Sequence, residues 1–171
     1  MFSQTVEYAL RVVVYLASLD GVPATTRQIA VVTKVPEGYL AKVLQGLSRA
    51  GLIQSQRGLH GGSVLALGAD KLSVYDVIEA VQPIQRIRSC PLNLKSHGVN
   101  LCPLHKRLDD AMAMVERAFR ESTISELLLQ TNGSKPLCDV EAITESPING
   151  SNGKSKPRAS AAVPLTVSRR R

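Results

Sequence analysis

The stretch that decides the fold runs from Gln28 to Leu67 and reads QIAVVTKVPEGYLAKVLQGLSRAGLIQSQRGLHGGSVLAL. Apolar residues recur at helical spacing on both sides of Lys34-Val35-Pro36, which is interpreted as a turn because the residue before a proline avoids helical angles. Two short alternating segments follow, joined by Arg57-Gly58-Leu59-His60-Gly61-Gly62. A pair of helices followed by a glycine-rich β-ribbon is typical of a winged helix.

The two helices of this stretch have recognisable ends. Thr25 or Thr26 caps the first helix, which ends near Thr33. The second helix runs from about Glu37 to Ala50, and Gly51 ends it. Its inward face is expected to consist of the apolar residues Leu40, Val43, Leu44 and Leu47.

The hairpin that follows is predicted to pair residues 52–56 with residues 63–67. Gly58, Gly61 and Gly62 lie in its turn, where we expect them to supply positive backbone angles.

Four further helices are predicted on either side of this stretch. The first covers residues 3–19 and is apolar around much of its circumference, which indicates burial on more than one side. A second covers residues 72–81, where Ser73 and Asp76 form a capping box. Pro103 opens a long helix to about Glu121, and Thr123 caps a last short helix through Leu129.

The charge of the chain points to an anionic partner. The 171 residues carry a net charge of +7, and nucleic acid is the first candidate. Residues 21–68 hold a single acid, Glu37, against five basic residues, Arg27, Lys34, Lys42, Arg49 and Arg57. No apolar run is long enough to cross a bilayer and no signal peptide precedes the first helix, so we expect a cytoplasmic, nucleoid-associated protein with no membrane partner.

Double-stranded DNA is therefore the expected ligand of the helix Glu37–Ala50 and the hairpin. Tyr39 and Lys42 are predicted to lie one turn apart on the outward face of this helix. Arg57 at the base of the hairpin is expected to reach a phosphate or a minor groove. A protein-contact module of the same shape is the alternative. The residues predicted to bind DNA are Gln28, Glu37, Gly38, Tyr39, Lys42, Arg57, Gly58, His60 and Gly61.

An enzyme is not expected. The sequence holds no nucleophile–base pair, phosphate-binding loop or paired carboxylates at useful spacing. The glycine cluster at residues 58–62 is too short for a nucleotide-binding loop.

Motifs along the first half of the chain resemble a known family. They are Phe2-Ser3-x-x-Val6-Glu7-Tyr8-Ala9-Leu10-Arg11, Ile29-Ala30, Tyr39-Leu40-x-Lys42-Val43-Leu44-x-x-Leu47, Gly51-Leu52-Ile53 and Arg57-Gly58-x-x-Gly61-Gly62-x-x-Leu65-Ala66. In this order they resemble the bacterial Rrf-two regulators, typified by IscR and NsrR, over about residues 1–129.

The resemblance implies a mainly α winged helix-turn-helix protein with a small β-hairpin wing and a long C-terminal dimerisation helix. Residues 1–83 are the expected DNA-binding domain, 84–106 a cysteine-containing sensor loop, and 103–130 the dimerisation helix with a short terminal helix. The apolar stripe of residues 103–121 supports a homodimer independently. The apolar face of an amphipathic helix that follows a complete domain must be buried against another surface. Residues 131–171, rich in Gly, Ser, Asn, Pro and Lys, are interpreted as a disordered basic tail.

Sensor members of this family hold an iron–sulfur cluster with three cysteines ahead of the dimer helix. Here Cys90 and Cys102 take the first and third places, whereas Ser96 takes the middle one. The third cysteine of the chain, Cys138, falls in the tail, where we expect a solvated thiol.

The cysteine segment nevertheless contains enough soft and borderline ligands for a metal. Cys90, His97, Cys102 and His105 match the ligand types of a tetrahedral zinc site and of a two-cysteine, two-histidine [2Fe–2S] site. The family resemblance adds Glu7 as a ligand contributed across the dimer. A reversible thiol switch and the absence of sensor chemistry are the alternatives.

Two functions follow as hypotheses. The first is a homodimeric transcription regulator controlled by an iron–sulfur cluster, metal or redox state at Cys90 and Cys102. The alternative is a metal-free regulator or interaction module controlled by a protein partner.

Overall fold

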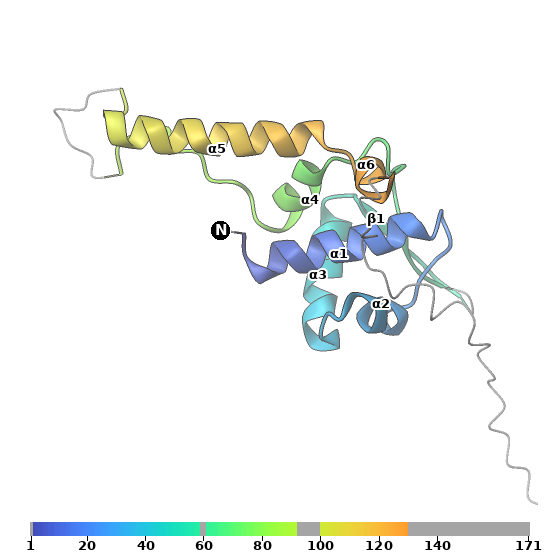
Figure 1. Ribbon diagram of the computed structural model, residues 1–171. Coiled ribbons are helices and arrows are strands. Elements are labelled where there is room, and N and C mark those ends of the chain that lie inside the picture. The colour runs from blue at the N-terminus through green and yellow to red at the C-terminus, as the bar shows by residue number, and fades with distance from the viewer. Residues whose placement is uncertain (1, 59–60, 92–99, 130–171) are drawn as a thin grey trace, which may run out of the picture.

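The computed structural model describes residues 2–58, 61–91 and 100–129 (Figure 1). The predicted mainly helical fold with a two-stranded wing is confirmed. Predictions at His60, Ser96, His97, Cys138 and the tail lie outside the described residues. In chain order the elements are α1 (Gln4–Ser18), α2 (Thr26–Thr33), α3 (Glu37–Arg49), β1 (Ile53–Gln56), β2 (Gly62–Leu65), α4 (Val74–Val81), α5 (Pro103–Glu121) and α6 (Ile124–Leu129).

Helix α1 forms the centre of the core, as its nearly continuous apolar surface predicted. It packs against α2, α3, α4, α6 and β2 (Figure 1). Burial of such a helix on several sides removes most of its apolar area from water. Its buried residues are Val6, Ala9, Val12, Val13, Val14, Tyr15 and Leu16.

Capping residues set the helix ends close to their predicted places. The Thr25 hydroxyl accepts a hydrogen bond from the backbone N–H of Gln28, and the side-chain oxygen of Gln28 accepts one from the backbone N–H of Thr25. Ser73 and Asp76 form the predicted reciprocal pair, so α4 begins one residue after Ser73. Each box satisfies amide groups that the first helical turn leaves without partners.

Two of the three wing glycines do not have the backbone angles that were predicted for them. Gly58 has a positive φ of 117° as expected, but Gly61 and Gly62 do not. Added Cβ atoms at these two positions would lie 2.4 Å from the carbonyl oxygens of Gln56 and Ala24, respectively. The prediction was therefore wrong for Gly61 and Gly62, which are needed because backbone passes too close for a side chain.

The wing is tied to the helical body through β2. Strand β1 pairs antiparallel with β2, with Gln54 opposite Val64. Ser63 in β2 exchanges two backbone hydrogen bonds with Ala24 in the loop before α2, at N–O distances of 2.8 and 3.0 Å. One further backbone segment, at Ala24, therefore pairs with β2 and ties the hairpin to the helices.

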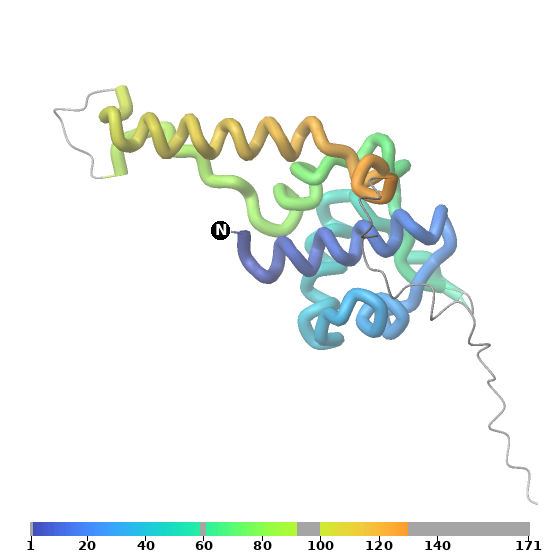
Figure 2. The backbone as a smooth tube through the Cα atoms, viewed as in Figure 1, coloured from blue at the N-terminus to red at the C-terminus, as the bar shows by residue number. Residues whose placement is uncertain are grey.

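The short helix α6 belongs to the hydrophobic core built by α1, α2, α3 and α4. The Ile124 side chain is fully buried, and its backbone amide donates to the Leu72 carbonyl at 2.8 Å. Figure 2 shows the chain returning after α5 to lie beside α1. The expected boundary at residue 83 stays a prediction, and Ile124 joins the core formed by the residues before it.

Helix α5 is the exception to this packing. It spans 19 residues and none of them is buried. It extends along one side of the molecule (Figure 1) and contacts the body mainly through α4 and the segment after it. None of the described helices is both long and apolar enough to cross a membrane.

Candidate nucleic-acid interface and cysteine site

Helix α3 presents one apolar and one polar face. Leu40, Val43 and Leu47 are at most 1% exposed and hold the helix on the core. The opposite face is exposed and offers two cations and several small or polar side chains. Such a face suits approach to a major groove. Its exposed residues are Glu37, Gly38, Ala41, Lys42, Gln45, Ser48 and Arg49.

Tyr39 does not lie on this outward face, contrary to the prediction. Its hydroxyl is 2.5 Å from the Thr5 hydroxyl, and its ring meets that of Tyr8 edge-on at 5.6 Å. The side chain is half-buried against α1 and serves partly as a packing residue. Lys42 does point outward, with its ammonium 6.0 Å from the Tyr39 ring centre.

Gln28 is also occupied by a structural role. Its side-chain oxygen accepts hydrogen bonds from both the backbone and the hydroxyl of Thr25 at 2.8 Å. Sequence reasoning placed Gln28 among the DNA-binding residues without recognising this cap. Its amide nitrogen is the part left for a ligand.

The basic residues of α2, α3, the turn between these helices and the wing have no acidic partner in an ion pair. Among residues 2–58, 61–91 and 100–129, none of these cations forms an ion pair, and Arg57 is exposed directly after β1, where the turn of the wing begins. A surface of unpaired cations attracts a polyanion and gains from counterion release when it binds. The cations concerned are Arg27, Lys34, Lys42, Arg49 and Arg57.

In the cysteine segment, the structure brings two of the predicted ligands together. Cys102 precedes α5 as its cap residue, and its Sγ lies 3.2 Å from Nδ1 of His105 one turn later. Cys90 is buried, and Glu7 is exposed on α1, where it pairs with Arg11. Within the described ranges, no cluster of three or more His, Cys, Asp or Glu side chains forms a metal site.

An arginine clamp fixes the segment that leads to Cys90. The Arg86 guanidinium binds both carboxylate oxygens of Asp109 at 2.7 Å and reaches Glu116 at 3.3 Å. The Ile87 amide also donates to Asp109 at 2.9 Å. The hydrogen bonds from Arg86 lower the pKa of Asp109 from 3.8 to about 2. Figure 2 shows this segment running alongside α5.

Arg120 links this group of ion pairs to α4. Glu116 accepts hydrogen bonds from Arg120, which lowers the pKa of its carboxyl. The Arg120 guanidinium lies over the ring of Tyr75 in α4, 3.6 Å from its centre. Sequence reasoning missed this network, although Asp109 and Glu116 are seven residues apart and so share one face of a helix.

Acid should weaken the clamp in a defined pH range. The Asp109 carboxyl stays ionised in the folded protein at pH values where the unfolded chain takes up a proton, so its stabilising contribution is complete above about pH 4. That contribution is lost as the pH falls toward 2. We therefore expect the difference in thermal midpoint between wild type and Asp109→Asn to shrink from pH 5 to pH 2.

The control for this measurement is Arg117→Gln. It removes an exposed charge of the same helix that forms no ion pair within the described residues. A difference between wild type and Asp109→Asn that stays constant with pH would contradict the assignment.

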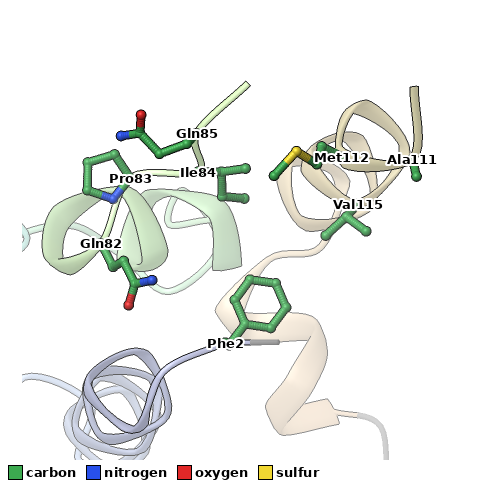
Figure 3. A pocket seen from close by; sticks show the side chains of 8 residues that line it. All are labelled: Phe2, Gln82, Pro83, Ile84, Gln85, Ala111, Met112 and Val115. Carbon is green, nitrogen blue, oxygen red and sulfur yellow. The ribbon is translucent and has the colours of Figure 1, made fainter. Parts of the chain in front are cut away.

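An apolar groove of about 400 Å³ separates the start of α1 from α5 (Figure 3). Phe2, Ile84, Met112 and Val115 point into it. Phe2 also meets Phe119 edge-on at 5.2 Å. The groove continues into an exposed apolar stripe on α5, where Leu104 is 65% and Leu108 is 48% exposed.

The comparisons with known proteins agree with this geometry. The Rrf2 family model, described as an iron-dependent transcriptional regulator, matches residues 2–130. A protein of Aquifex aeolicus (strain VF5) named as an HTH-type transcriptional regulator is 32% identical over 131 residues, which are 75% of this chain and 91% of that protein.

Two solved structures share the fold. CymR of B. subtilis, described as its global cysteine regulator, superposes with a TM-score of 0.64 at 24% identity, covering 77% of this chain and 98% of CymR. IscR of T. potens gives a TM-score of 0.65 at 21% identity, covering 78% of this chain and 89% of IscR. The prediction of a regulator rather than an enzyme is confirmed by the family model and by the Aquifex aeolicus relative. The family match over most of the chain, together with the winged-helix geometry, shows that the chain belongs to the Rrf2 family of transcriptional regulators.

Proposed function

We propose that this regulator binds a specific double-stranded DNA site as a homodimer, with α3 in the major groove and the wing against the backbone. The observation that carries the proposal is the uncompensated positive charge of the exposed α3 face and the wing. Lys42 and Arg57 lie on these two elements. Base edges in the major groove supply sequence information, whereas the phosphates fix the position of the protein.

Binding to the DNA upstream of its own gene tests this function. The affinity should fall steeply as salt rises, because each phosphate neutralised by a cation releases counterions. Arg57→Ala should reduce the slope of log affinity against log salt by about one. Arg117→Ala, which removes an exposed arginine of α5, should leave the slope unchanged. Absence of salt-dependent binding by the wild-type protein overturns the proposal.

The homodimer is supported by the unburied state of α5. A helix of 19 residues with an apolar stripe and no buried residue leaves a large apolar patch in contact with water. The same stripe on a second copy of the chain can cover this patch. A two-fold dimer interface uses the same surface of both subunits in this way. Two wings and two α3 helices would then meet two half-sites, and dimer geometry would set their spacing.

Control of DNA binding is assigned to the cysteine segment. Thiolate and imidazole are ligands of both [2Fe–2S] clusters and zinc. Two ligands of one tetrahedral zinc lie about 3.6 Å apart, so the 3.2 Å between Cys102 and His105 fits a metal after a small opening. Two more ligands complete four: Cys90 is the proposed third, and either His97 or Glu7 of the partner subunit is the proposed fourth. A [2Fe–2S] centre is the first candidate, with zinc as its alternative.

Anaerobic purification followed by visible spectroscopy and elemental analysis tests the metal. A coloured protein whose absorption disappears in Cys102→Ala and in His105→Ala is the expected result. Cys138→Ala is the matched control, because it removes a cysteine outside this segment, and it should retain the colour. A colourless protein that contains zinc selects the alternative metal.

A metal-free regulator controlled by a protein partner is the second candidate function. Two observations favour it. Ser96 stands where the family has its middle cysteine, and within the described part of the chain Cys102 and His105 are the two proposed ligands that contact each other. A colourless, metal-free protein that still binds its DNA site would select this function over the metal sensor.

A further inference from the structure

We propose that Gln45 is the residue of α3 that reads a base, and that it recognises an adenine in the major groove. The inference rests on the proposed function and deepens it, because it names a specificity-determining residue that the motifs do not single out. Four features of α3 carry it: the direction of Gln45, the small residues ahead of it, its unused hydrogen-bonding groups and the cations on its flank.

Gln45 lies at the centre of the exposed face. At about 100° per residue, it is rotated by roughly 170° from the mean direction of Leu40, Val43 and Leu47. Those three side chains are almost fully buried, so Gln45 points nearly straight away from the core. A groove that receives α3 lengthwise on this face meets the Gln45 side chain first.

Two small residues lie in front of Gln45 on the same face. Long helical side chains lean toward the N-terminus and cover the turn before them, and that turn carries Ala41 and then Gly38. A Cβ added at Gly38 would meet nothing within 4 Å, and its φ is not positive. The fold therefore does not require glycine there, although glycine in a helix costs stability relative to alanine. Close approach of a DNA surface explains this choice.

The amide of Gln45 is available to a ligand. Within residues 2–58, 61–91 and 100–129, no hydrogen bond engages its side chain, whereas Gln28 spends its amide oxygen on the cap of α2. A glutamine amide offers one donor and one acceptor in a plane, which match the N6 donor and N7 acceptor of adenine. Among the major-groove edges, this pairing is the one that glutamine makes in a bidentate way.

The cations of α3 lie to one side of Gln45. Lys42 and Arg49 line a groove between α3 and the end of α4, together with Thr5 and Glu79, and Gln45 lies at the edge of α3 that borders the same groove. Phosphates that flank the base pair are the natural partners of these two side chains. The centre of the face is therefore left to a neutral side chain, and base reading is separated from phosphate binding.

Selection of bound duplexes from a random pool tests the inference with the full chain. The wild-type protein should select an adenine at one position of each half-site. Gln45→Ala should lower the preference for that adenine by about 5- to 150-fold while leaving non-specific affinity and the salt slope unchanged. Gln45→Arg should move the preference from adenine to guanine at the same position, since arginine pairs with guanine.

Two further variants distinguish base recognition by Gln45 from non-specific attraction between the protein and DNA. Lys42→Ala should weaken binding to all sequences alike and keep the adenine preference. Gly38→Met should retain the thermal midpoint and lose affinity, because its long side chain fills the space before Gln45. Unchanged base preference in both Gln45 variants overturns the inference while leaving the proposed function intact. Failure of the wild-type protein to bind any duplex overturns both.

Discussion

Replacing Leu108 and Val115 with glutamate is expected to convert the protein into a monomer and to weaken its DNA binding by about 100-fold or more. Both side chains are more than 40% exposed on the apolar stripe of α5. Two charges there cannot be desolvated against a second copy without a large cost. A monomer engages one half-site only, so it loses the gain that linking two binding modules provides.

Sedimentation or light scattering gives the mass of the variant, and titration of a two-half-site duplex gives its affinity. Arg117→Glu is the matched control, because it changes the net charge by the same two units on an exposed position of the same helix, away from the stripe. That control should remain dimeric. A double variant that remains a dimer would show that α5 does not form the interface. Retained folding of the variant follows from the absence of buried residues in α5.

Gly62→Ala is expected to destabilise the wing and the whole domain. The added Cβ would lie 2.4 Å from the oxygen and 2.6 Å from the carbon of the Ala24 carbonyl. These are backbone atoms, so relief requires the loop and β2 to separate and the two bonds between Ala24 and Ser63 to break. Overpacking of this kind costs about 1–3 kcal/mol, which lowers the thermal midpoint by several degrees.

Affinity for DNA should fall together with stability in Gly62→Ala, because the displaced hairpin carries Arg57. Gly38→Ala is the control for the thermal measurement, since a Cβ at that position meets no atom within 4 Å. Its thermal midpoint should be equal to or higher than that of the wild type. An unchanged midpoint for Gly62→Ala would mean that Ala24 and β2 are not packed as described.

Most helix boundaries were predictable because local signals set them. The capping pair Ser73–Asp76 and the proline at position 103 occupy their predicted roles. Positive φ at Gly51 and Gly58 likewise follows from turn chemistry. These interactions join residues no more than a few positions apart, so the order of the residues is enough to recognise them.

The candidate sites were less predictable because their partners come from distant segments. Tyr39 turns inward to meet Thr5, 34 positions earlier, and periodicity alone placed it outside. Arg86 meets Asp109 across 23 positions. Gln45 carries no local motif, and its central position is visible only once the buried face of α3 is known.

By itself, the sequence determined that this chain has a winged helix with an excess of basic residues, a long amphipathic helix and a cysteine segment in front of that helix. Periodicity, capping and glycine chemistry act over one or two turns, and the sequence records them directly. Only the tertiary structure decided that α6 completes the core, that Gly61 and Gly62 are required by close backbone contacts, and that Arg86 anchors the cysteine segment to α5. Those outcomes depend on which surfaces meet after folding, because burial and backbone approach are properties of the packed chain.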